Sequence, residues 1–162
     1  MKKRIAQAFI GVSAASALLL TVGTSDAFAS AYVTWTNVAT GRCLHHNIYY
    51  SLDQVTTDSC GTDNSTKWLD IDYADGTWVE SPVGMQGGVN PNGVCLTAYK
   101  DNSVYIEGCD WSNPNSYEKW WENATQTGWM IQNVATLNIL DSNSAGSVYA
   151  IGSNGGNYQR WT

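Results

Sequence analysis

The residues in this sequence that could do catalytic chemistry are two adjacent histidines and several carboxylates. His45 and His46 are the only histidines, and they lie in a segment that we predict to be a β-strand. Because successive side chains of a strand point to opposite faces, the two rings cannot bind one metal ion together in the simplest geometry. Asp70 and Asp72 do share a strand face, but the sequence does not distinguish a glycosidase pair from solvated surface carboxylates. Ser and Cys nucleophile motifs are absent. We therefore expect a protein that is not an enzyme and uses no metal and no cofactor.

Aromatic residues are the second notable group. The sequence holds eight Trp, nine Tyr and two Phe, and both Phe residues, Phe9 and Phe28, lie within the first 29 positions. Trp and Tyr combine an apolar face with a polar edge, which suits half-wet binding surfaces as well as cores. The aromatic content is therefore compatible with ligand binding.

Residues 1–29 have the three parts of a secretory signal peptide. A basic start, MKKR, precedes a mostly small or apolar run over residues 5–22, and Ala27-Phe28-Ala29 places small residues at both specificity positions of a cleavage site. Cleavage would follow Ala29, or Ala31 if the overlapping ASA is used. The alternative is a retained membrane anchor, but the apolar run is short for a bilayer span. We expect a secreted, extracellular protein.

The chain that remains after cleavage is acidic. Three of the eight basic residues and one of the fourteen acidic residues lie in the first 29 positions, which leaves five basic and thirteen acidic residues and a net charge of −8. Such a chain, with no basic cluster, does not attract phosphate backbones or anionic lipid surfaces. We therefore expect neither nucleic acid nor membrane as a partner.

Residues 30–162 consist of three copies of one unit. GRCLHHN, VTTDSC and STKWLD occur in this order, followed by GVCLTAYKDN, VYIEGC and YEKWWE, and then by LNILDSN, VYAIGS and NYQRWT. The alignment places repeats at about 32–76, 77–124 and 125–162. It matches three sets of positions: Cys43, Cys95 and Ile139; Cys60, Cys109 and Ser153; and Trp68, Trp120 and Trp161.

The string NVAT supports this periodicity. It occurs at 37–40 and 133–136, and it begins six positions before Cys43 and six before Ile139. The middle repeat has VNPNGV at the same offset, so a Pro-Asn-Gly turn replaces the string there. The interval between the two copies therefore spans two repeats.

Each repeat contains strand-sized runs separated by turn residues. Runs such as YVTWTNV, RCLHH, QVTTD and KWLDI have strand lengths, whereas NPNG, KDN, NSAG and SNGG are typical of turns. About four strands per repeat gives about twelve strands. A four-stranded unit cannot bury both of its faces, so three copies must share one core in a closed arrangement. The sequence thus predicts an all-β protein with the β-trefoil fold, and Trp68, Trp120 and Trp161 pointing into its core.

The four cysteines are expected to form two disulfides, as is typical of exported proteins. Four cysteines allow three connectivities, and the repeat alignment favours Cys43 with Cys60 and Cys95 with Cys109. Each bond would close a loop within one repeat. Repeat three has neither cysteine, so packing by Ile139 must replace the bond there.

These features together resemble the ricin-type (ricin B-type) β-trefoil lectin family. A Cys-Leu pair near the start of a repeat, a second Cys after a strand and a terminal Gln-x-Trp, here Gln159-Arg160-Trp161, are typical of that family, and the resemblance covers about residues 31–162. It implies that each repeat can hold a shallow sugar pocket, where a ring stacks on the sugar and a few polar groups select its hydroxyls. The implied partner is a glycan, or a cell-wall or plant polysaccharide.

The resemblance also implies which residues contact the sugar. In the family an Asp two residues after the first Cys accepts hydrogen bonds from the sugar, an aromatic residue two before the second Cys stacks on it, and an Asn or Gln near Gln-x-Trp completes the contacts. Repeat three matches the polar part of this pattern with Asp141, Asn157 and Gln159. Its aromatic position is Ile151, so stacking would need Tyr149, two residues earlier on the same strand face, or Tyr158.

The other two repeats depart from the pattern, so we expect a sugar site only in repeat three. The candidate residues of repeat three could also have structural roles in place of sugar binding: Gln159 could tie the repeat together, and Asp141 could cap a turn. The three positions are His45, Asp58 and Thr66 in repeat one and Thr97, Glu107 and Glu118 in repeat two. Alternative aromatic platforms in or near loops are Tyr49, Tyr50, Trp78, Tyr99 and Trp111.

Two functions are compatible with these features. The leading hypothesis is a secreted, non-catalytic lectin that binds a galactose-like or other neutral glycan through repeat three, weakly unless it is multivalent. The alternative is a protein-binding β-trefoil, acting as an adaptor in a secreted toxin or enzyme complex or as a protease inhibitor. The eroded sugar positions and the Trp-rich and Tyr-rich loops favour this alternative, because aromatic residues also anchor protein interfaces.

Overall fold

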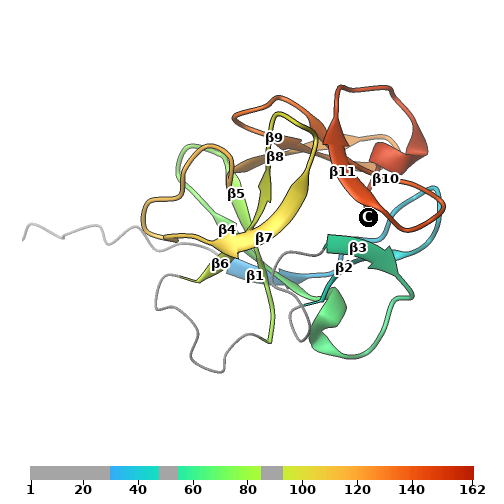
Figure 1. The fold of residues 1–162 in the computed structure, drawn as a ribbon, viewed down its shortest axis with the longest axis horizontal. Helices are drawn as coiled ribbons and strands as arrows, with labels where there is room; N and C mark the ends of the chain where they lie inside the picture. The colour runs from blue at the N-terminus through green and yellow to red at the C-terminus, as the bar shows by residue number, and fades with distance from the viewer. Residues whose placement is uncertain (1–29, 48–54, 85–92) are drawn as a thin grey trace, which may run out of the picture.

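The computed structural model describes residues 30–47, 55–84 and 93–162 (Figure 1). The predicted signal peptide, together with Tyr49 and Tyr50, lies outside the described residues. The described chain forms eleven strands and two 3₁₀ helices: β1 (Ser30–Val33), β2 (Cys43–His46), β3 (Val55–Asp58), η1 (Asn64–Thr66), β4 (Trp68–Asp72), β5 (Trp78–Pro82), β6 (Val94–Ala98), β7 (Val104–Gly108), β8 (Trp120–Thr125), β9 (Gly128–Asn133), β10 (Ile139–Ser142), β11 (Val148–Ile151) and η2 (Asn157–Gln159).

The largest sheet has seven strands in the order β1-β4-β5-β8-β9-β10-β11, and the end of the chain closes the part from β1 to β9 into a barrel. Trp161 exchanges both backbone hydrogen bonds with Trp129 of β9, at 2.7 and 3.0 Å. Thr36 and Thr162 likewise donate to each other's carbonyl groups, at 2.7 and 2.9 Å. Residues 161–162 therefore lie between β9 and the segment that follows β1, and they complete a barrel in place of a twelfth named strand.

One hairpin per repeat packs beside this barrel: β2–β3, β6–β7 and β10–β11. Strands β3, β7 and β11 contact one another, and Figure 1 shows β2–β3 beside β10–β11 at the C-terminus. The backbone of Thr57 donates to Gly146 at 2.8 Å, and that of Ala150 donates to Asn102 at 3.0 Å, so the third hairpin bonds to both others. A closed barrel with three hairpins is the β-trefoil arrangement, and the fold prediction is confirmed.

The three aligned Trp residues have no exposed surface and make the same hydrogen bond in each repeat. Their indole Nε1 atoms donate to a backbone carbonyl at 2.9–3.0 Å. The acceptor is always the Leu that follows the first aligned position of the same repeat. The pairs are Trp68 with Leu44, Trp120 with Leu96 and Trp161 with Leu140.

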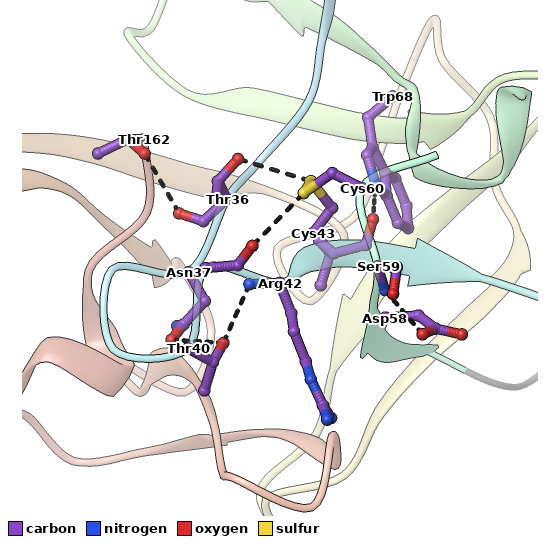
Figure 2. The surroundings of a disulfide bond; sticks show 12 residues. Thr36, Asn37, Thr40, Arg42, Cys43, Asp58, Ser59, Cys60, Trp68 and Thr162 are labelled. Atoms are coloured by element: carbon purple, nitrogen blue, oxygen red, sulfur yellow. Dashed lines mark hydrogen bonds between the residues drawn. A yellow bond between two sulfur atoms is a disulfide. The ribbon is translucent and has the colours of Figure 1, made fainter. Parts of the chain in front are cut away.

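Both disulfides that the repeat alignment favoured are present. Cys43 pairs with Cys60 and Cys95 with Cys109, with Cα–Cα distances of 5.0 and 5.8 Å. Figure 2 shows the first bond beside the turn before β2, where the Thr36 hydroxyl lies 3.5 Å from the Cys43 sulfur. In repeat three, Ile139 occupies the equivalent position and is buried.

The two NVAT strings form the same turn. Asn37 and Asn133 are completely buried, and each side-chain oxygen accepts from the backbone N–H of the Ala two residues later, at 3.2 and 3.1 Å. Their side-chain nitrogens donate to the carbonyls of Tyr158 and Tyr117, at 2.8 and 2.7 Å. An Asn that bonds to its own turn favours this geometry locally. NVAT therefore links the first strand of a repeat to the segment before an aligned Trp.

The residue after NVAT differs between the repeats, although its backbone does not. Gly41 has a φ of 66° and Leu137 a φ of 62°, and the Leu137 side chain is 59% exposed. The left-handed conformation costs a residue with a Cβ atom about 1–2 kcal/mol, part of which glycine loses again through its unfolded-state entropy. We expect Leu137→Gly to raise the free energy of unfolding by about 1 kcal/mol in urea denaturation, and Gly41→Ala to lower it by a similar amount. A lower stability for Leu137→Gly would contradict this interpretation.

Helices contribute little to the fold. Within the described residues, η1 and η2 are the only helices. No helix in this part of the chain has the length and apolar character needed to cross a membrane.

Candidate functional site

The third hairpin brings the predicted carboxylate and its aromatic neighbour together. Asp141 of β10 pairs directly with Tyr149 of β11 in the antiparallel register. Directly paired residues project from the same face of a sheet, so the two side chains are neighbours. The Tyr149 hydroxyl donates to the carbonyl of Ser142 at 3.1 Å, which fixes its half-buried ring.

Asp141 is almost fully buried but retains one unused acceptor. Its side chain is 2% exposed, and Oδ2 accepts from Asn154 Nδ2 at 3.2 Å. Oδ1 is buried and has no hydrogen-bond partner among the described residues. Burial raises the pKa of the Asp141 carboxyl above its usual 3.8, although the side-chain amide of Gln159, the backbone N–H of Ser142 and the side-chain amide of Asn154 partly offset this.

Asp141 does not cap the turn that follows β10. That role belongs to Asn143, whose side-chain oxygen accepts from the backbone N–H groups of Ala145 and Ser147 at 3.0 and 3.1 Å. The Asp141 carboxylate is directed instead toward the loop after β11, where Asn154 lies. A turn-capping role for Asp141 is therefore not what the structure shows.

Gln159 holds this loop in place. It is completely buried, its Oε1 accepts from the backbone of Asn154 at 2.8 Å, and its Nε2 donates to the carbonyl of Gly152 at 3.1 Å. Both ends of the side-chain amide are thus engaged within the repeat. Gln159 positions Asn154, and through it Asp141, from inside the protein.

Asn154 is a site residue to which the resemblance does not point. Its side chain bonds to Asp141, its Oδ1 accepts from the backbone of Gly156 at 2.8 Å, and the residue is exposed. The available signal was its position in the SNGG turn before Gln-x-Trp, where Asn commonly bonds to the backbone two residues later.

The remaining candidates lie in or beside η2. Asn157 is exposed, and its side chain makes no hydrogen bond within the described chain. Tyr158 is 38% exposed. Burial, followed by the Asp141 charge and the Tyr158 hydroxyl, raises the pKa of Tyr149. Repeat three therefore gathers a carboxylate, two Tyr residues and an exposed amide around one hairpin.

Two of the equivalent positions, both in repeat two, serve internal contacts. Glu107 accepts from the Tyr99 hydroxyl at 2.6 Å, and Glu118 accepts from the backbone of Asn115 at 2.8 Å.

His46 is buried against the edge of Trp68, and burial lowers its pKa. These contacts make the histidine a neutral core residue.

Asp70 does not lie on the solvated surface, which was one of the two environments that the sequence allowed for Asp70 and Asp72. It is 5% exposed and faces two further acidic residues, Glu80 and Glu122, which the resemblance does not indicate. The sequence did contain a signal: each of these acids follows a Trp by two positions, in WLD, WVE and WWE. Trp and acid therefore share a strand face in all three segments.

Comparison with known proteins supports the fold. No protein-family model matches this chain. Among solved structures, it is similar to ThreeFoil, a designed protein with threefold symmetry, at 17% sequence identity and a TM-score of 0.65 over 80% of this chain and 95% of the other. It is also similar to SeviL bound to asialo-GM1 saccharide, at 14% identity and a TM-score of 0.61 over 82% of this chain and 95% of the other.

A third similar structure is a GlcNAcα1-4Gal-releasing endo-β-galactosidase from Clostridium perfringens. The identity is 17% and the TM-score 0.64, over 81% of this chain and 32% of the enzyme. The present chain thus corresponds to about a third of that protein. At these identities the likeness establishes the shared fold.

Proposed function

We propose that this protein is a secreted, non-catalytic carbohydrate-binding β-trefoil, and that it binds a neutral glycan at the third repeat. The observation that carries the proposal is the buried, unpartnered Oδ1 of Asp141 beside Asn154 and Tyr149. A buried acceptor without a partner costs about 1–3 kcal/mol, more when it is charged. A sugar hydroxyl that displaces the exposed Asn154 side chain is a donor that would remove this cost.

The surrounding groups suit a sugar ring. Tyr149 is half-buried and Tyr158 is exposed, so their rings offer apolar surface next to the carboxylate. Asn154 and Asn157 are exposed amides that can donate to or accept from hydroxyls. An apolar platform with a few fixed polar groups is the usual composition of a small-molecule site.

Two further observations support this proposal. The Gln-x-Trp resemblance places the expected polar residues in repeat three, and one protein of similar fold has been solved with a bound saccharide. Two disulfides are typical of an oxidising, extracellular environment, which agrees with a signal peptide at residues 1–29.

Asp141→Asn is expected to weaken glycan binding about 10- to 100-fold, because hydrogen bonds to a charged acceptor contribute about 1.5–3 kcal/mol. A glycan array would identify the ligand, and isothermal titration calorimetry would measure its affinity. Asp101→Asn is the matched control, since Asp101 is an exposed acid in the equivalent hairpin of repeat two that bonds only to Ser103. Unchanged affinity in Asp141→Asn, or no glycan bound by the wild type, would overturn the proposal.

Acidification tests the same carboxylate without a mutation. Protonation of Asp141 removes its negative charge, so affinity should fall as the pH is lowered through the raised pKa of this group, above the usual 3.8. Burial raises the pKa of the neighbouring Tyr149 above its usual 10, so Tyr149 stays neutral in this range and does not contribute. Asp141→Asn should lack this pH dependence, and the same dependence in that variant would assign the effect to another group.

The exposed aromatic surface of repeat three favours one other function. Trp129 is 40% exposed and Tyr158 is 38% exposed, and aromatic residues of this kind anchor protein interfaces. If the protein is an adaptor or inhibitor, a pull-down from culture supernatant should recover a stoichiometric protein partner, and Trp129→Ala should abolish that binding. Free sugars would not displace that partner, whereas they would release a glycoprotein held by a lectin site.

A further inference from the structure

Three acidic side chains converge in the barrel at a place far from the third hairpin in sequence. Asp70 of β4 pairs directly with Glu80 of β5, and Glu122 comes from β8, the next strand of the sheet. One carboxylate oxygen from each residue lies within 4.8 Å of the other two. Three neighbouring strands therefore contribute one acid each to a single cluster.

The cluster lies on the buried side of these strands. Asp70 and Glu122 share a face with Trp68 and Trp120, which are fully buried in the main core. The opposite face of β4 and β5 carries Ile71 and Val79, which pack against the Cys95–Cys109 bond. The acids thus point toward the barrel interior together with the core Trp residues.

Each of the three carboxylates has one oxygen without a donor. Asp70 Oδ1, Glu80 Oε2 and Glu122 Oε1 are all buried and have no hydrogen-bond partner within the described chain. Trp35 Nε1 donates to the other Glu80 oxygen at 2.9 Å. No basic side chain compensates the cluster, since the one ion pair of the described residues joins Lys119 to Asp75. Buried carboxylates are normally paired, hydrogen-bonded or bound to metal.

Three carboxylates this close together, two of them buried, repel one another unless a proton or a cation lies between them. A cation at the centre would compensate the three charges at once and satisfy the three unused oxygens.

We propose that Asp70, Glu80 and Glu122 bind a divalent cation with a preference for oxygen ligands, and that this cation is Ca²⁺. Carboxylate oxygens suit hard cations such as Ca²⁺, Mg²⁺ and Mn²⁺. Oxygens up to 4.8 Å apart can reach one Ca²⁺ at its usual 2.3–2.6 Å with small side-chain adjustments, whereas Mg²⁺ requires a closer and more regular shell at about 2.0–2.1 Å.

Burial differs among the acids of the cluster. Glu80 is fully buried and Asp70 nearly so, whereas Glu122 is half-buried. A cation bound between the three carboxylates would link β4 of repeat one to β5 and β8 of repeat two. This role is structural and independent of the proposed sugar site in repeat three.

The test uses the full secreted chain, first treated with a chelator and then titrated with CaCl₂. Calorimetry should show one saturable site with a dissociation constant no weaker than about 0.1–1 mM, the range of extracellular calcium modules. Saturating Ca²⁺ should raise the melting temperature by several degrees, because it binds only the folded state, and Mg²⁺ should raise it less. Glu122→Gln should weaken Ca²⁺ binding at least tenfold, while Asp101→Asn should leave it unchanged.

Two results would overturn the proposal. One is a chelated wild-type protein whose melting temperature does not change when Ca²⁺, Mg²⁺ or Mn²⁺ is added, together with a Glu122→Gln variant that is at least as stable as the wild type. That result would indicate that the carboxyls are protonated and bind no cation. The other is Ca²⁺ binding that Glu122→Gln and Asp70→Asn leave unchanged. Glu122 is half-buried, so its neutral variant should fold even where Glu80→Gln does not. Glycan binding measured in the same variants separates a failure here from a failure of the sugar site.

Discussion

Trp120→Ala is expected to lower the free energy of unfolding by about 3–5 kcal/mol, the range for truncating a buried Trp. The side chain is completely buried in the main core, and its indole Nε1 donates to the carbonyl of Leu96 at 2.9 Å. Truncation therefore removes apolar contacts, leaves a cavity and orphans a buried carbonyl. Because Trp68 and Trp161 occupy equivalent places, their Ala variants should lose similar amounts.

Urea denaturation followed by circular dichroism would measure these differences. Trp120→Phe separates packing from hydrogen bonding, because it keeps an aromatic ring but leaves the Leu96 carbonyl unpaired, at an expected cost of about 1–3 kcal/mol. Trp129→Ala is the control, since this Trp is 40% exposed and should change stability much less. If the Trp120 and Trp129 variants lost equal stability, the core would not depend on the aligned Trp positions.

Removal of the Cys95–Cys109 bond by the double substitution to Ala should cost about 3 kcal/mol or more. The bond closes a loop with a sequence separation of 14, and both cysteines pack in a cluster with Ile71, Tyr73 and Val79. The unfolded chain gains loop entropy when the bond is absent, and the native cluster also loses its sulfur contacts. The variant should therefore melt at a markedly lower temperature than the wild type.

The Cys43–Cys60 double variant is the natural comparison. Its sequence separation is 17, so the entropic contribution is similar, but Cys60 is exposed and contributes less packing. The Cys43–Cys60 variant should thus lose less stability than the Cys95–Cys109 variant under the same denaturant titration. The reverse order would show that loop constraint, and not burial of the sulfurs, decides the contribution of each bond.

The repeat pattern was enough to predict the scaffold. The alignment of the Cys and Trp positions across the three repeats predicted the disulfide pairs and the three core Trp residues, because the threefold fold places equivalent residues in equivalent environments. The NVAT strings likewise marked one turn used twice, closed by its own Asn side chain. These features depend on local chemistry and on periodicity, and both are visible in one dimension.

The candidate site was only partly predictable for the same reason. Asp141 and Tyr149 are paired across a hairpin, so their proximity follows from strand register. The contact of Asp141 with Asn154 depends on how the loop after β11 folds back, and Gln159 sets that path from the core. No spacing rule connects residues across an irregular loop.

What the sequence by itself determined is the three-repeat β-trefoil, its two disulfides and its buried Trp triad, since alternation, turn residues and repetition are short-range properties. Only the tertiary structure decided that Asp70 meets Glu80 and Glu122 inside the barrel, and that Asp141 is buried with one oxygen unpartnered. Barrel closure sets which inward-facing side chains converge, and it is a property of all the strands together. Charge on a strand face becomes a buried cluster only when the sheet closes around it.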